Sequence, residues 1–134
     1  MTLLTDSRPA TQVLLLDEGY ATSLDAVAAS VALFGRGRLE ILCAPDLGSL
    51  RQTARELAAL RIPTVIVVDV DEHPAPKSIL AEAAEAGFPL AVLSDGRDDA
   101  IHDHALSVGA AAYLLTPLPA QELVARLEAL PAER

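Results

Sequence analysis

The sequence predicts an α/β fold: a five-stranded parallel sheet, doubly wound, with helices on both faces in a three-layer sandwich. Short apolar runs rich in Leu, Val and Ile recur along the chain. Such continuous runs are typical of strands that are covered on both faces. A segment with helical spacing follows each run, and this strict alternation of strand and helix indicates a parallel sheet.

The expected strands end in polar residues or breaks. The third is the strongest, because all four of its residues are β-branched Val or Ile. Thr116-Pro117 breaks the fifth. The five strands are expected at residues 13–16, 39–44, 65–68, 90–93 and 112–115.

The expected helices have ordinary start and stop signals. Thr22 or Ser23 is an N-cap candidate for the first, and Asp46 for the second. The second ends before Pro63, because a residue that precedes proline avoids the helical region. Glycines follow the first, third and fourth. The helices are expected at residues 22 or 23 to 34, 46–61, 78–86, 98–108 and 119–130.

The length of 134 residues suits one domain over residues 1–134, with residues 1–10 as a flexible lead-in. The chain is 51% hydrophobic but only 3% aromatic, so it lacks the rings of a base-stacking surface. The chain has a net charge of -9, so a phosphate backbone or an anionic membrane would repel it. We therefore expect no direct nucleic-acid binding and no membrane attachment.

A single cysteine, Cys43, lies in the second expected strand, and we expect it to be buried as a small hydrophobe. One cysteine forms no internal disulfide. The sequence has no recognisable signal peptide and no apolar run long enough to span a membrane. These features favour a cytoplasmic location.

Polar residues gather where the strands end. In open parallel sheets, ligands bind beyond the carboxyl ends of the strands. Asp17, Glu18, Asp69, Ser94 and Thr116 are expected at that edge. Carboxylates that lie close together repel one another, and Mg²⁺ would relieve the repulsion with one or two carboxylates and water as ligands.

Four segments in this order resemble the receiver domain of bacterial response regulators. They are Val-Leu-Leu-Leu-Asp17-Glu18, Val-Ile-Val-Val-Asp69-Val, Ala-Val-Leu-Ser94 and Gly109-Ala-Ala-Ala-Tyr113-Leu-Leu-Thr116-Pro117. The resemblance covers nearly the whole chain and implies the flavodoxin-like receiver fold. It also implies a signalling module rather than an enzyme.

The resemblance implies a role for each acidic residue. Asp17 and Glu18 match the metal-binding pair, and Asp69 matches the aspartate that accepts a phosphoryl group from a histidine kinase and also binds the metal. The backbone of Asp71 would supply another metal ligand, and the expected cofactor is Mg²⁺. We expect residues 71–73 otherwise to lie at the loop surface.

Further roles follow from the last two matching segments. Ser94 matches the hydroxyl that contacts the phosphoryl group, and Tyr113 matches the aromatic residue that switches rotamer on activation. Pro117 follows the position of a cis peptide bond in the family.

Two departures from the family pattern concern the phosphorylation site. The family places a Lys just before the proline, whereas this chain has Thr116, which carries no charge. Losing a charge-assisted contact costs on the order of 1.5–3 kcal/mol. The family usually has a Pro four residues after the acceptor aspartate and a Gly later in the same loop. Here Pro74 comes five residues after Asp69, and Lys77 lies near the expected Gly. Lys77 is a candidate substitute for the missing cation.

Three functions remain open at this point. The favoured one is a degenerate receiver that acts through protein–protein interaction with weak or absent phosphorylation. The first alternative is a phospho-acceptor receiver switched at Asp69 with Mg²⁺, and the second a flavodoxin-like cofactor-binding domain. The last is disfavoured because residues 18–22 form no Gly-rich phosphate cradle.

The expected partners are proteins, such as a histidine kinase or a phosphotransfer protein. The resemblance also implies a homodimer surface formed by the fourth helix, fifth strand and fifth helix. Ile101, Leu106 and the edges of the helix at residues 119–130 are the candidates on it.

Overall fold

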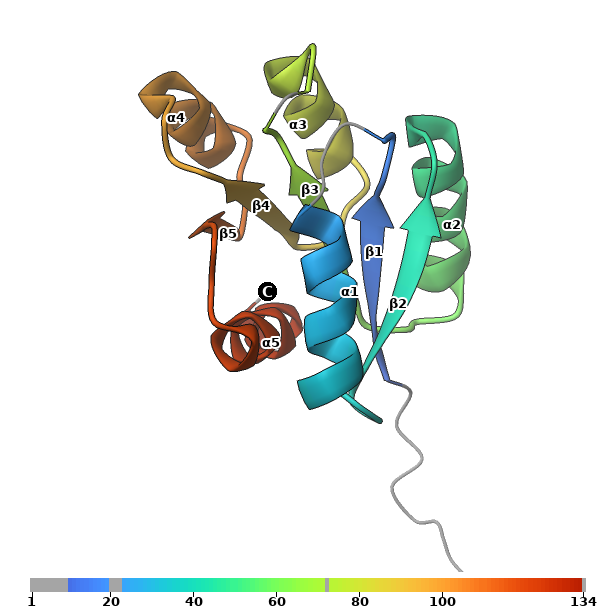
Figure 1. The fold of residues 1–134 in the computed structure, drawn as a ribbon. Coiled ribbons are helices and arrows are strands. Elements are labelled where there is room, and N and C mark those ends of the chain that lie inside the picture. Colours follow the sequence, from blue (N-terminus) through green and yellow to red (C-terminus); the bar gives the residue numbers. More distant parts are fainter. Residues whose placement is uncertain (1–9, 20–22, 72, 134) are drawn as a thin grey trace, which may run out of the picture.

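A computed structural model describes residues 10–19, 23–71 and 73–133. It contains a parallel five-stranded sheet in the order β2-β1-β3-β4-β5, as Figure 1 shows. The strands are β1 (Thr11–Leu16), β2 (Leu39–Ala44), β3 (Thr64–Asp69), β4 (Leu90–Ser94) and β5 (Ala112–Leu115). The predicted fold class is confirmed, while the strand order comes from the structure alone.

Helices cover both faces of the sheet. Helices α1 and α5 pack on one face, and α2, α3 and α4 pack on the other (Figure 1). The short helix η1 (Leu130–Glu133) extends α5. The five α-helices are α1 (Ser23–Phe34), α2 (Leu47–Ala59), α3 (Pro76–Ala84), α4 (Asp99–Ser107) and α5 (Ala120–Ala129).

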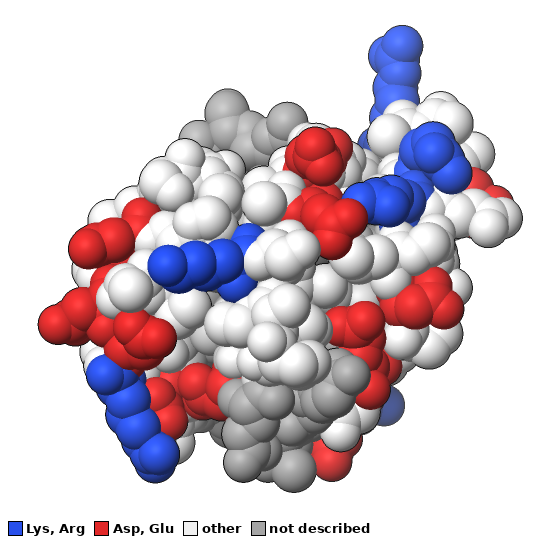
Figure 2. All heavy atoms as spheres, turned by 90° about the horizontal axis from the view of Figure 1, so that it is seen from above, with Lys and Arg blue, Asp and Glu red and all other residues white. Residues whose placement is uncertain are grey.

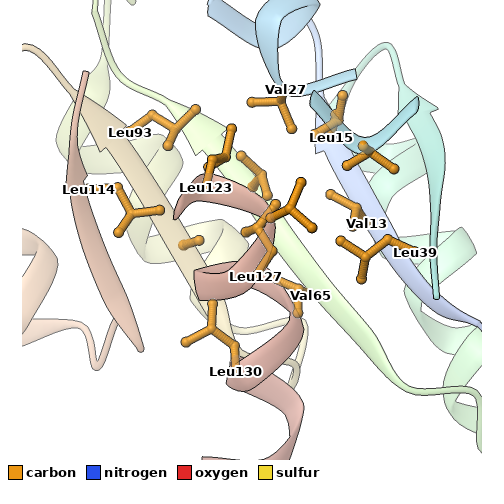
Figure 3. Close-up of a cluster of buried hydrophobic side chains, with 14 of the residues drawn as sticks. Val13, Leu15, Val27, Leu39, Val65, Leu93, Leu114, Leu123, Leu127 and Leu130 are labelled. Carbon is orange, nitrogen blue, oxygen red and sulfur yellow. The ribbon is translucent and has the colours of Figure 1, made fainter. Parts of the chain in front are cut away.

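The core is aliphatic on both faces. Figure 3 shows the cluster under α1 and α5, where Val27 from α1 and Leu123 from α5 face Leu93 of β4. Leu15 and Leu114 belong to the same cluster. Because the central strands are buried on both faces, the carboxyl ends of β1 and β3 are held at a fixed position.

Strand β1 and helix α3 each begin two residues earlier than predicted, helices α2 and α3 each end two residues earlier, and the other boundaries agree within one residue. Strand β1 begins at Thr11 rather than residue 13, because the side-chain amide of Gln12 donates to Glu40 Oε1 at 2.8 Å and is thereby satisfied within the sheet. Helix α3 begins at Pro76 rather than residue 78, since proline at the first helical position leaves no amide hydrogen unpaired. The N-cap role of Asp46 is confirmed by the bond from Ser49 N to its Oδ1, at 2.7 Å.

Two predictions about burial are wrong. Cys43 is exposed, because β2 is an edge strand and its outer positions are only partly covered. Ile101 is buried between α4 and the sheet, so it does not contribute to an outer surface. Within the described ranges, no helix is both long and apolar enough to cross a membrane.

Candidate functional site

The site lies where β1 and β3 end side by side. The direction of the connections reverses between these two strands, and this switch point is where open parallel sheets bind ligands. Leu16 pairs with Val68, so Asp17 and Asp69 follow paired positions at this edge. The switch point therefore places the carboxylates of β1 beside the end of β3.

Asp69 is the last residue of β3 and is only 5% exposed. Its Oδ1 accepts a hydrogen bond from the backbone N–H of Asp71 at 2.8 Å. A buried carboxylate needs such bonds to offset its lost hydration. Asp69 is thus held in one orientation at the base of the site.

Asp71 joins two loops of the site. Its Oδ1 accepts from the backbone N–H of Asp95 at 3.2 Å, which ties the β3–α3 loop to the turn after β4. The backbone of Asp71 remains a predicted metal ligand. Its amide is already engaged with Asp69, and the carbonyl is the group that would bind a cation.

Glu18 contacts the β3–α3 loop through His73. The distance from His73 Nε2 to Glu18 Oε1 is 2.8 Å, and His73 Nδ1 accepts from the backbone N–H of Ala75 at 3.0 Å. This pattern fits the neutral Nε2–H tautomer, which donates to Glu18. His73 lies in the loop as predicted, but the residue is half-buried, because its side chain, which packs against Glu18, is only 10% exposed.

The sequence carried no signal for the contact between Glu18 and His73. The two residues are 55 positions apart, and their contact depends on β1 and β3 being neighbours in the sheet. Glu72, between Asp71 and His73, lies outside the described residues.

The ends of β4 and β5 bring together uncharged groups. Ser94 is 3% exposed, and its Oγ accepts from the backbone N–H of Gly96 at 3.1 Å. Its carbonyl accepts from Thr116 N at 2.9 Å, so Thr116 is fixed beside the end of β4. The Thr116–Pro117 peptide bond is cis. The Ser94 hydroxyl keeps its own hydrogen for donation to a ligand.

Tyr113 lies in β5, with its ring against His102 of α4 at a centroid separation of 4.5 Å. Among the described residues its hydroxyl is buried and has no hydrogen-bond partner. A buried hydroxyl without a partner is destabilising, so another position of this ring would be favoured if it offered a partner. The switch role of Tyr113 remains a prediction.

The acidic residues provide a donor set for a hard cation, although they are not gathered around one point. Within the described ranges, no three His, Cys, Asp or Glu side chains are grouped to hold a metal ion. Mg²⁺ needs only one or two carboxylates together with water. The oxygens of Asp17 and Asp69 fit that need, whereas Glu18 is bound to His73.

On the face shown in Figure 2, the described acidic side chains do not form one continuous surface. Figure 2 views the molecule from above Figure 1, and its acidic side chains lie in separate groups with Lys and Arg between them. Arg97, for example, pairs with Asp95 at 2.9 Å. Surface pairs of this kind contribute little to stability, but they break up the negative field.

No family model and no curated protein matches the sequence. Solved structures match its fold. A CheY-like response regulator receiver domain protein from Methanospirillum hungatei JF-1 aligns with a TM-score of 0.67 and 18% identity, over 93% of this chain and 96% of that chain. A putative pilus assembly-related protein from Burkholderia pseudomallei K96243 aligns with a TM-score of 0.69 and 16% identity, over 99% and 96%.

A response regulator protein from Burkholderia pseudomallei, solved with a phosphorylated aspartic acid, a calcium ion and citrate, aligns with a TM-score of 0.63. Its identity is 20%, over 92% of this chain and 69% of that chain. Similarities at these identities concern the fold. The resemblance inferred from the four sequence segments is confirmed at that level: the chain has the flavodoxin-like fold of response regulator receiver domains.

Proposed function

We propose that this chain is a receiver-like signalling module, not an enzyme, and that it acts through contacts with other proteins while phosphorylation of Asp69 is weak or absent. The observation that carries the proposal is Thr116. It is held beside the end of β4 by its bond to Ser94 O, and it supplies no positive charge there.

The charge is needed because phosphoryl transfer places negative charge on oxygens that positive groups must stabilise. A threonine hydroxyl donates one neutral hydrogen bond. The burial of Asp69 and the hydrogen bond between Glu18 and His73 would weaken phosphorylation further, since both limit access to the carboxylates. Lys77, the candidate substitute for the missing cation, is exposed on α3. Its backbone carbonyl accepts a hydrogen bond from His104 Nε2 at 2.9 Å.

The alternative is a working acceptor site with Mg²⁺. Its support is the retained set of Asp17, Asp69 and Ser94 at the switch point, and one similar structure is described with a phosphorylated aspartic acid and a calcium ion. In that case Asp17 and Asp69 would hold the cation, which would supply positive charge, and Ser94 would donate to the phosphoryl group.

A protein partner is proposed to bind over α4 and β5, and the same surface would serve a homodimer. Leu106 and Leu115 support this, because they are 58% and 54% exposed and large exposed apolar side chains are candidates for interfaces. A histidine kinase or phosphotransfer protein would be such a partner under the alternative function. A cytoplasmic location remains part of the proposal and rests on the single cysteine.

Intact mass after incubation with acetyl phosphate and Mg²⁺ tests the proposal. We expect the full chain to gain little or no adduct of about 80 Da, which is the mass of HPO₃ added by one phosphorylation. Asp69→Asn is the matched control, because it keeps the size and the Asp71 contact but loses the nucleophile. A stoichiometric adduct that disappears in Asp69→Asn would establish the alternative instead.

A further inference from the structure

A cavity of about 270 Å³ lies between α1, α5 and the ends of β4 and β5. It opens next to Thr116, at the edge of the cluster drawn in Figure 3, where Val27, Leu93 and Leu123 form its inner wall. Its outer wall includes Ser23, Ala26 and Ser30 of α1 and Leu118 after the cis proline.

The lining is mostly apolar, with hydroxyl groups but no charged side chain. Ser30 Oγ is satisfied, since it donates to Ala26 O at 2.7 Å. Ser23 Oγ differs: among the described residues it is buried and has no hydrogen-bond partner. Buried hydroxyls are normally paired, so an unpaired one at the wall of a cavity points to a missing partner.

We propose that this cavity binds a small, uncharged molecule with an apolar body and one hydroxyl or carbonyl oxygen, which pairs with Ser23. The apolar body follows from the aliphatic wall. The absence of charge on the ligand follows from the lining, because a buried ion would find no counter-charge there. The cavity lies just below the roughly 300–1,000 Å³ of sites for drug-sized ligands, so the ligand is smaller than these.

The position of the cavity connects it with the strand ends. Leu93 precedes Ser94 in β4 and pairs with Asp69, while Thr116 donates to Ser94 O. A ligand in the cavity therefore contacts the residues that position Ser94. This gives the domain a chemical input that does not require phosphorylation, and it is independent of the function proposed above.

Three probes of similar shape test the proposal on the full chain by two-dimensional amide NMR: benzyl alcohol, toluene and benzoate. We expect saturable shifts at the amides of Ser23, Val27, Leu93 and Leu118. Benzyl alcohol should bind about three- to tenfold more tightly than toluene, which is the effect of one hydrogen bond. Benzoate should bind more weakly than either, because its charge is not compensated.

Variants of α1 assign the binding to the cavity. Ser23→Ala should remove the advantage of benzyl alcohol over toluene. Ala26→Phe fills space at the wall and should weaken both, whereas Ala29→Phe, an exposed position of the same helix, should leave both unchanged. Shifts that do not saturate, tight benzoate binding, or an alcohol preference that survives Ser23→Ala would each overturn the proposal. The acetyl phosphate experiment is unaffected by any of these outcomes.

Discussion

The two halves of the strand-end site differ in charge and in how completely their polar groups are paired. The acidic half comprises Asp17, Glu18, Asp69 and Asp71, and each of these carboxylates accepts a hydrogen bond. The neutral half comprises Ser94, Tyr113 and Thr116. It contains a buried hydroxyl without a partner among the described residues, and it adjoins a cavity.

Under the proposed function, this difference identifies the half that limits phosphoryl transfer. The acidic half keeps oxygen ligands that suit a cation, and its loops are tied to one another. The neutral half lacks the positive charge that would balance a phosphoryl group on the opposite side. The site therefore has cation ligands on one side and no positive charge on the other. A single substitution in the neutral half should change the rate of phosphorylation most.

The largest expected effect is that of Thr116→Lys, which introduces a charge into the neutral half. A charge-assisted contact is worth about 1.5–3 kcal/mol, so the rate of adduct formation with acetyl phosphate and Mg²⁺ should rise about 10- to 100-fold. The measurement is the time course of intact mass. Thr116→Gln is the control, because it adds length without charge. An equal rise in Thr116→Gln would mean that shape, not charge, limits the reaction.

Alanine substitutions at Gly96 and Gly19 compare the stability of the turns in the two halves. Gly96 has a φ of 82° and an added Cβ would lie 2.9 Å from Leu115 Cδ2, whereas Gly19 has a φ of 91° with nothing within 4 Å. Left-handed backbone costs alanine about 1–2 kcal/mol, so both Ala variants should lose that much stability in urea unfolding. Gly96→Ala should lose slightly more, because the contacted atom is the end of an exposed side chain that can turn away, and Leu115→Ala should remove this excess. Equal losses would mean that Leu115 moves aside freely.

His73→Ala tests the tie within the acidic half. It removes the bond to Glu18 and the acceptor for Ala75 N, so the free energy of unfolding should fall by about 1 kcal/mol. Glu18→Gln should cost less, because the amide oxygen still accepts from His73. In the double-mutant cycle of His73→Ala with Glu18→Ala, we expect a coupling of about 0.5–1 kcal/mol. A coupling of zero would contradict the contact.

The smallest effect is expected for Tyr113→Phe in the neutral half. Because the hydroxyl is buried without a partner among the described residues, its removal should leave stability unchanged or raise it by up to about 1 kcal/mol. Tyr113→Leu, which also removes the ring against His102, is the control and should be less stable. A clear loss in Tyr113→Phe would reveal a partner for the hydroxyl.

The pattern of apolar runs determined most of the fold. Every expected strand and helix is present, and the boundaries of α1, β2 and β5 agree with the prediction. Runs of Leu, Val and Ile locate buried strands because both of their faces must be covered. The burial of single residues was less predictable. Cys43 is exposed because β2 lies at the edge of the sheet, and the apolar sequence of a strand does not show whether the strand is central or at the edge.

The position of Asp17, Asp69, Ser94 and Thr116 at one edge of the sheet was also predictable, since each of them follows a predicted strand. Chain order alone put these residues at one edge, because all strands of a parallel sheet end on the same side. The contact between Glu18 and His73 and the cavity beside Thr116 were decided by the tertiary structure. Both depend on the order β2-β1-β3-β4-β5 and on the packing of α1 against α5, which bring together residues far apart in the chain.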